Sequence, residues 1–138
     1  MGGWGRDVDQ WGSILKRNRN RGFRNLRVWQ DAVELYVLAC EVLQGFPFEL
    51  KRTSSNAIDA AHSVSRNISE GYCRGSRKEY LMFLNYARAS CGEFHSCYVT
   101  FLRAAQISQE DFDRLDDLHF KLENGLLALI ASLGDTRP

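Results

Sequence analysis

The most regular feature of the sequence is a series of apolar residues between positions 80 and 105. Its members alternate at intervals of four and three residues: Tyr80, Leu84, Ala87, Cys91, Phe94, Tyr98, Phe101 and Ala105. An average interval of about 3.5 residues keeps such side chains on one face of an α-helix that packs against other helices. The series therefore predicts a long helix from Ser76 to about Gln106, with a helical bundle built around it.

Three other segments have helical periodicity. They extend from about Leu26 to Gln44, from about Thr53 to Cys73, and from Ser108 to Leu133. Only a few residues separate each segment from the next, and short connections join neighbouring helices that run in opposite directions. We therefore predict an all-α fold, an antiparallel up-down-up-down four-helix bundle.

Residues that favour helix ends mark the boundaries of these segments. Ser76, with Glu79 three residues later, has the pattern of a capping box, and Ser108 is placed as an N-cap. Gly71 and Gly75 are typical of helix C-termini, where a glycine adopts the left-handed conformation. We expect Gly71 to end the second helix in this way.

The first and fourth helices carry apolar residues beside their main contact faces. These additional residues are Val28, Leu35 and Val42 in the first helix and Leu127 and Ile130 in the fourth. A monomeric bundle does not need this much apolar surface, and exposed apolar patches usually mark interfaces. The additional rows therefore predict a homo-oligomer.

The region around the second connection resembles a known family. It reads N-I-S-E-G from Asn67 to Gly71, S-R-K-E-Y from Ser76 to Tyr80, and F-L-N-Y-A-R-A-S from Phe83 to Ser90. This pattern resembles the four-helix-bundle family that includes proteins encoded within intervening sequences of 23S ribosomal RNA genes and the accessory variability determinants of diversity-generating retroelements. The resemblance implies assembly into a ring, typically a homopentamer, without enzymatic activity. It also implies, for members of the retroelement type, binding of nucleic acid and of a reverse transcriptase.

One part of the chain departs from that family. Where the family usually carries Gln-x-Arg-Arg-Ala-x-x-Ser in the second helix, this chain has the stretch from Asn56 to Ser63. Ile58 and Asp59 occupy the places of the two arginines. The departure argues against a nucleic-acid-binding face of the family's type on this helix.

Basic residues are concentrated toward the N-terminus. Residues 1–27 contain seven Lys or Arg against two Asp, whereas the remaining 111 residues contain eleven basic and fifteen acidic residues. We interpret residues 1–22 as a basic, flexible arm, residues 23–134 as the bundle domain, and residues 135–138 as a short tail. A disordered extension without a function is the alternative for the arm.

Alternating Arg and Asn in a flexible arm suit contacts to phosphates, and an adjacent aromatic ring suits stacking on unpaired bases. Basic residues between the second and third helices can extend such a surface. The predicted nucleic-acid-binding residues are Lys16, Arg17, Arg19, Arg21, Phe23, Arg24, Arg27, Arg74, Arg77 and Lys78. Whether the arm and the connection form one patch is left open by the sequence.

The pattern of His, Cys and acidic residues does not indicate a metal site or an enzyme. A di-iron bundle needs Glu-x-x-His on two helices, and the single Asp116-x-x-His119 has no counterpart. The cysteines Cys40, Cys73, Cys91 and Cys97 lack a C-x-x-C spacing, and only Cys73 is expected to be exposed. We expect no metal, no cofactor and no catalysis, with His119 as a hydrogen-bonded core residue.

The N-terminal region has no apolar segment of the kind found in secretory signals, and no apolar run approaches the roughly 18 residues of a membrane helix. We expect a cytoplasmic protein without membrane contact. Two hypotheses for its function follow. The first is a non-catalytic, oligomeric accessory protein that binds RNA or DNA, with a reverse transcriptase as a possible partner. The second is a structural or protein-interaction scaffold whose basic arm is incidental.

Overall fold

The computed structural model of the protein describes residues 19–134, including the side chains from Gly22 onward. Within this range the fold is all-helical and contains no strand. The long helices are α2 (Arg27–Leu43), α3 (Lys51–Cys73), α4 (Arg77–Arg103) and α5 (Gln109–Gly134). Short 3₁₀ helices precede α2 and α3, namely η2 (Arg19–Asn25) and η3 (Phe48–Leu50). Lys16, Arg17 and the rest of the predicted arm before Arg19 lie outside the described residues, as does the predicted tail.

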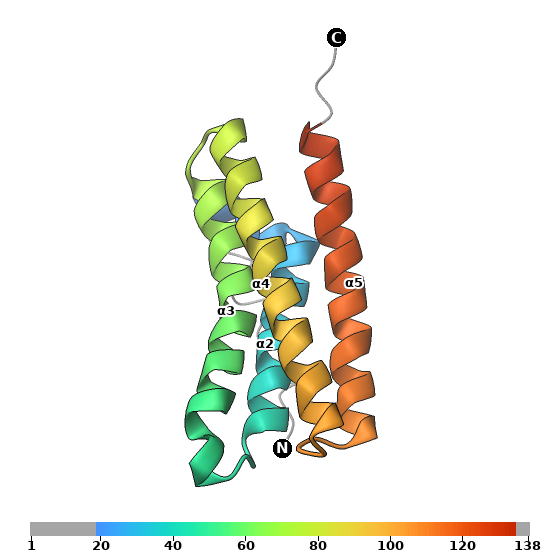
Figure 1. The fold of residues 1–138 in the computed structure, drawn as a ribbon. Helices are drawn as coiled ribbons and strands as arrows, with labels where there is room; N and C mark the ends of the chain where they lie inside the picture. The colour runs from blue at the N-terminus through green and yellow to red at the C-terminus, as the bar shows by residue number, and fades with distance from the viewer. Residues whose placement is uncertain (1–18, 135–138) are drawn as a thin grey trace.

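The four long helices pack side by side around a single core (Figure 1). Helix α3 contacts α2 and α4, and α5 contacts the other sides of α4 and α2, so that the contacts close into a ring. The connection between α3 and α4 lies at one end of the molecule, while the other two connections lie at the opposite end (Figure 1). We call the connection between α3 and α4 the corner.

The two predicted helix starts are confirmed. The Ser76 hydroxyl accepts a hydrogen bond from the Glu79 backbone N–H at 3.3 Å, and the Ser108 hydroxyl accepts one from the Asp111 N–H at 3.0 Å. Each serine therefore satisfies a backbone donor that the first helical turn leaves unpaired.

The prediction for Gly71 is wrong. Helix α3 continues two residues past it to Cys73, and the left-handed residue at the corner is Gly75, with φ +72°. Gly71 is buried inside α3, where an added Cβ would lie 2.6 Å from the Cβ of Phe83 on α4. The absence of a side chain at Gly71 thus permits α3 and α4 to approach closely just before the corner.

Two helix boundaries also differ from the prediction. Helix α4 ends at Arg103, and Ala105 follows it in the left-handed conformation with φ 60°. Ala105 is exposed, so it does not belong to the buried face of α4. Helix α3 begins at Lys51, two residues earlier than expected, because η3 leads directly into it.

The core includes the row of α2 that was predicted to be surplus. Leu35 is fully buried and Val28 is 7% exposed, whereas Trp29 and Tyr36 are only partly buried. Helix α2 lies between α3 and α5, so two adjacent apolar rows face inward rather than one. Val42 and Ile130 also pack against the core. The inference that these rows are exposed is therefore wrong, and only Leu127 is exposed as expected.

Large apolar side chains are exposed elsewhere. Met82 and Tyr86 lie four residues apart on α4, and Phe120 and Leu127 lie seven residues apart on α5. Each pair therefore shares one face of its helix. Phe48, before α3, is the most exposed large hydrophobic residue in the described part of the chain, at 82%.

Candidate nucleic-acid interface

Contacts between the helices divide the bundle into two halves along its length. Ser63 of α3 meets Ser90 of α4 at 2.9 Å, and His119 of α5 meets the Cys91 carbonyl of α4 at 3.0 Å. We define the corner half as residues 19–34, 63–90 and 119–134, and the far half as residues 35–62 and 91–118. The ion pair between Lys121 and Asp31, at 3.5 Å, lies in the corner half and relates α5 to α2.

Charged residues are distributed unequally between these halves. The corner half contains ten Lys or Arg and five Asp or Glu, whereas the far half contains four Lys or Arg and nine Asp or Glu. The bundle is therefore basic toward the corner and acidic toward the opposite end. An anionic polymer is attracted to the corner half and repelled by the far half.

The 3₁₀ helix η2 joins the base of the predicted arm to the corner half. The Phe23 ring packs edge-on against Trp29, with centroids 5.3 Å apart, and against Tyr72 of α3, with centroids 6.3 Å apart. A Cβ added at Gly22 would overlap the Tyr72 hydroxyl, so η2 lies directly on α3. The described base of the predicted arm, η2, therefore lies beside the end of α3 that leads into the corner.

This packing also defines the surroundings of Phe23. The ring is partly buried, and the Phe23 carbonyl accepts a hydrogen bond from the Leu26 N–H at 3.0 Å. The Arg24 carbonyl accepts one from the Gln30 side chain at 2.8 Å. Arg19 and Arg21 belong to η2, but their side chains lie outside the description.

Arg74 at the corner is held by acidic neighbours. Its guanidinium donates to Glu70 at 2.8 Å and to Glu79 at 3.3 Å, and it lies 4.9 Å from the centre of the Phe83 ring. The hydrogen bond to Glu70 is the main cause that raises the pKa of Arg74 above its ordinary value. Arg74 thus ties the end of α3 to the start of α4, and two carboxylates compete with any phosphate for it.

The other predicted basic residues differ in how they are engaged. The Arg77 side chain donates to the Leu133 carbonyl at 2.6 Å and so caps the end of α5. Arg27 and Lys78 are exposed, and neither forms an ion pair with another residue of the described range. Arg88, which the prediction did not include, is exposed in the same half and likewise forms no ion pair within that range. Arg27, Lys78 and Arg88 are therefore available for phosphates.

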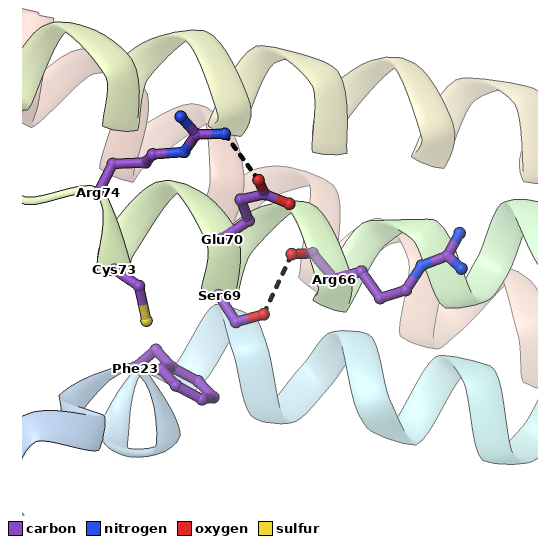
Figure 2. Close-up of a pocket in the computed structure, with 6 residues that line it drawn as sticks. All are labelled: Phe23, Arg66, Ser69, Glu70, Cys73 and Arg74. Carbon is purple, nitrogen blue, oxygen red and sulfur yellow. Dashed lines mark hydrogen bonds and ion pairs between the residues drawn. The ribbon is translucent and has the colours of Figure 1, made fainter.

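A groove of about 560 Å³ lies between η2 and α3. It is lined by Phe23, Arg66, Ser69, Glu70, Cys73 and Arg74 (Figure 2). Arg66 was missed in the sequence because it lies away from the basic clusters. Arg66, Glu70 and Arg74 are spaced by four residues, which places them along one side of α3. This spacing could have identified Arg66 from the sequence.

Buried polar groups occur where the two halves meet, but they do not form a metal site. His119 is 4% exposed and stacks on His95, with ring centroids 4.9 Å apart. Burial lowers the pKa of His119 below its ordinary value, which keeps the ring neutral, as a core residue requires. No group of three or more His, Cys, Asp or Glu able to hold a metal ion occurs in the described range.

The cysteines have the expected exposures. Cys91 is buried, which raises the pKa of its thiol to about 12. Cys40 and Cys97 are partly buried, and Cys73, in the groove, is exposed. All four are free thiols.

Comparison with known proteins gives the family. A model of the 23S rRNA-intervening sequence protein family matches residues 24–128, which is most of the four-helix domain. The chain belongs to this family. The match begins inside η2 at residue 24, so it includes the corner and the α3 side of the groove but neither Phe23 nor the arm before it. No curated protein matches the chain. Among the described residues of this family member, no helix is both long and apolar enough to cross a membrane.

Proposed function

We propose that the protein is a non-catalytic accessory protein that binds RNA or DNA through the corner half of its bundle. The observation that carries this proposal is the unequal charge of the two halves. Because both halves surround the same core, core packing gives no reason for ten basic residues at one end and nine acidic residues at the other. Phosphate contacts give such a reason.

The available cations support a contact to the backbone of the nucleic acid. Arg27 is exposed on α2, and Lys78 and Arg88 are exposed on α4, all within the corner half. Arg19, Arg21 and Arg24 belong to η2, the base of the arm, which is part of the same half. Contacts of this kind carry little sequence information, so we propose binding with modest sequence preference and a strong dependence on salt.

We further propose that the helices form an antiparallel up-down-up-down bundle and that several bundles assemble into a ring, with five copies as the expected number. The alternation of the connections between the two ends supports the first part (Figure 1). The second part is supported by two exposed apolar pairs, Met82 with Tyr86 and Phe120 with Leu127. These pairs replace the rows of α2, which are buried, as the proposed contact surface between copies. A ring would present several basic arms to one strand and so increase the effective affinity of each. We also propose a reverse transcriptase as a partner. We propose the cytoplasm as the location of the protein.

Fluorescence anisotropy with a labelled RNA, measured between 50 and 200 mM salt, tests the binding proposal. Over this range, binding dominated by phosphate contacts weakens by orders of magnitude. We expect the parent protein to bind with such a dependence. Replacement of Lys16, Arg17, Arg19, Arg21 and Arg24 by Ala should weaken binding and lower the salt slope by about one unit for each phosphate that the variant no longer neutralises.

A scaffold without nucleic-acid binding is the second candidate, and the exposed Phe48 and Phe120 favour it because large exposed apolar residues usually contact a partner. The same titration separates the candidates. Failure of the parent protein to bind RNA or DNA at 50 mM salt would leave the scaffold as the better account.

A further inference from the structure

We propose that the groove between η2 and α3 is a site for an unpaired nucleotide, with the base against Phe23 and a neighbouring phosphate at Arg66. The proposal rests on the proposed function, because it names the place in the corner half where a nucleic-acid strand is held by more than its charge. Paired nucleotides in a duplex do not fit it, because their bases are already stacked on one another.

The groove has the size and lining that such a ligand needs. Its volume of about 560 Å³ lies within the range of small-molecule sites. Phe23 provides an aromatic ring, and its two aromatic neighbours meet it at interplanar angles of 72° and 68°. Neither neighbour is therefore stacked in parallel on the ring, which is the arrangement that a nucleobase adopts on an aromatic side chain.

The charges of the groove favour an anion. Glu70 and Arg74 neutralise each other at 2.8 Å, and Figure 2 shows the Arg74 guanidinium directed to Glu70. Arg66 then supplies the net positive charge of the groove. Its guanidinium is 3.5 Å from Asp59, and both side chains are more than half exposed, so solvent screens this pair and a phosphate can replace it.

The Ser69 side chain lies between Phe23 and Arg66 in Figure 2. The Ser69 hydroxyl donates to the Arg66 carbonyl at 3.0 Å, so its oxygen can still accept a hydrogen bond from a base. Cys73 lies beside Phe23 in Figure 2, and it is the exposed cysteine of the chain. A base on Phe23 would cover the Cys73 thiol, which makes this thiol a reporter of occupancy.

Two substitutions and two RNA ligands test the site. The ligands are an unpaired oligonucleotide of about 12 nucleotides, within the range of single-strand sites, and a duplex of equal length. Phe23→Leu keeps an apolar side chain but removes the stacking ring, and we expect it to weaken binding of the unpaired RNA about fivefold or more while duplex binding stays the same. Arg66→Gln should weaken binding of the unpaired RNA about threefold or more.

Arg52→Gln is the matched control for Arg66→Gln. It removes the same charge from an exposed position on α3, but in the far half. We expect less than about a twofold effect on either RNA, because a contact in the corner half does not involve this residue. Circular dichroism and thermal unfolding identify any variant that has lost its fold.

Protection of Cys73 in the parent protein tests the site without a substitution in the groove. Unpaired RNA should slow the reaction of Cys73 with a thiol reagent and duplex RNA should not, with Cys73→Ser to subtract the other thiols. If unpaired RNA binds but leaves Cys73 equally reactive, and Phe23→Leu and Arg66→Gln behave like Arg52→Gln, the groove proposal is overturned and the proposed function stands. If neither RNA binds the parent protein, both proposals are overturned.

Discussion

The corner half and the far half surround one continuous core, yet they carry opposite charge. Two leucines of α5, Leu126 in the corner half and Leu115 in the far half, are both fully buried. Folding therefore requires the same kind of apolar pattern in the two halves. Their surfaces differ: the corner half has ten basic and five acidic residues, whereas the far half has four basic and nine acidic residues. The comparison separates what folding requires from what it leaves free. Since the charge is not required by the core, we attribute it to a ligand.

The equality of the two cores is tested by Leu126→Ala and Leu115→Ala. Each substitution removes a fully buried side chain and should cost about 2.7–5 kcal/mol in the free energy of unfolding. Denaturant unfolding monitored by circular dichroism measures both. Leu127→Ala, at the exposed neighbour of Leu126, is the control and should cost clearly less. A cost below about 1 kcal/mol at either buried position would show that the core is not continuous.

A glycine in each half sharpens the comparison next. Gly71→Ala should destabilise the protein by about 1–3 kcal/mol, because the new Cβ would lie 2.6 Å from the Cβ of Phe83 and the helices would have to separate. Gly92→Ala, in the far half, meets no atom within 4 Å and should be neutral or stabilising by up to about 1 kcal/mol. Equal effects in denaturant unfolding would contradict the close contact of α3 and α4 at the corner.

A smaller effect is expected at His119, where the two halves meet. Burial lowers its pKa, while Asp116 and Glu123 of α5 and the Cys91 carbonyl of α4 oppose this and His95 adds to it. The unfolded chain, with a His pKa near 6.5, therefore takes up the proton more readily than the native protein. Stability should be complete above about pH 6.5 and fall as the pH decreases below it, until the native ring also titrates. The slope for one proton is at most about 1.4 kcal/mol per pH unit.

His119→Gln should reduce this slope, since Gln keeps a donor for the Cys91 carbonyl but does not titrate in this range. His62→Gln, at a half-buried position against Tyr36, is the control for the loss of an imidazole and should retain the slope. Thermal unfolding between pH 5 and 8 distinguishes the two variants. An unchanged slope in His119→Gln would show that another group causes the pH dependence.

Local patterns were sufficient to predict much of this fold, because they report on one helix at a time. The caps at Ser76 and Ser108, the buried face from Leu84 to Phe101 and the burial of His119 all follow from spacing and residue type. Gly71 was misinterpreted because a glycine near a helix end has two uses, and only the position of Phe83 on the next helix distinguishes them.

The rest depended on how the helices meet. Two apolar rows on α2 would be more than the helix needs if it packed against one long helix. It packs against two, α3 and α5, so two rows face inward. The meeting of η2 with Tyr72, and hence the groove, joins residues about 50 positions apart that no periodicity relates. The predicted basic residues stay candidates, and the ion pairs of Arg74 with Glu70 and Glu79, like the place of Arg66 in the groove, required the structure.

The most direct test of the central claim compares two triple variants of equal charge. Arg27, Lys78 and Arg88 are exposed in the corner half, and Lys51, Arg52 and Arg103 are exposed in the far half. Each set is replaced by Gln, and the affinity for unpaired RNA is measured between 50 and 200 mM salt, the range over which binding through phosphates weakens steeply. We predict that the corner variant binds more weakly and that its salt slope is lower by up to about three units, one for each cation removed, while the far variant binds within about twofold of the parent. Equally weakened binding in the two variants, or weaker binding in the far variant, would contradict the claim that the corner half is the nucleic-acid interface.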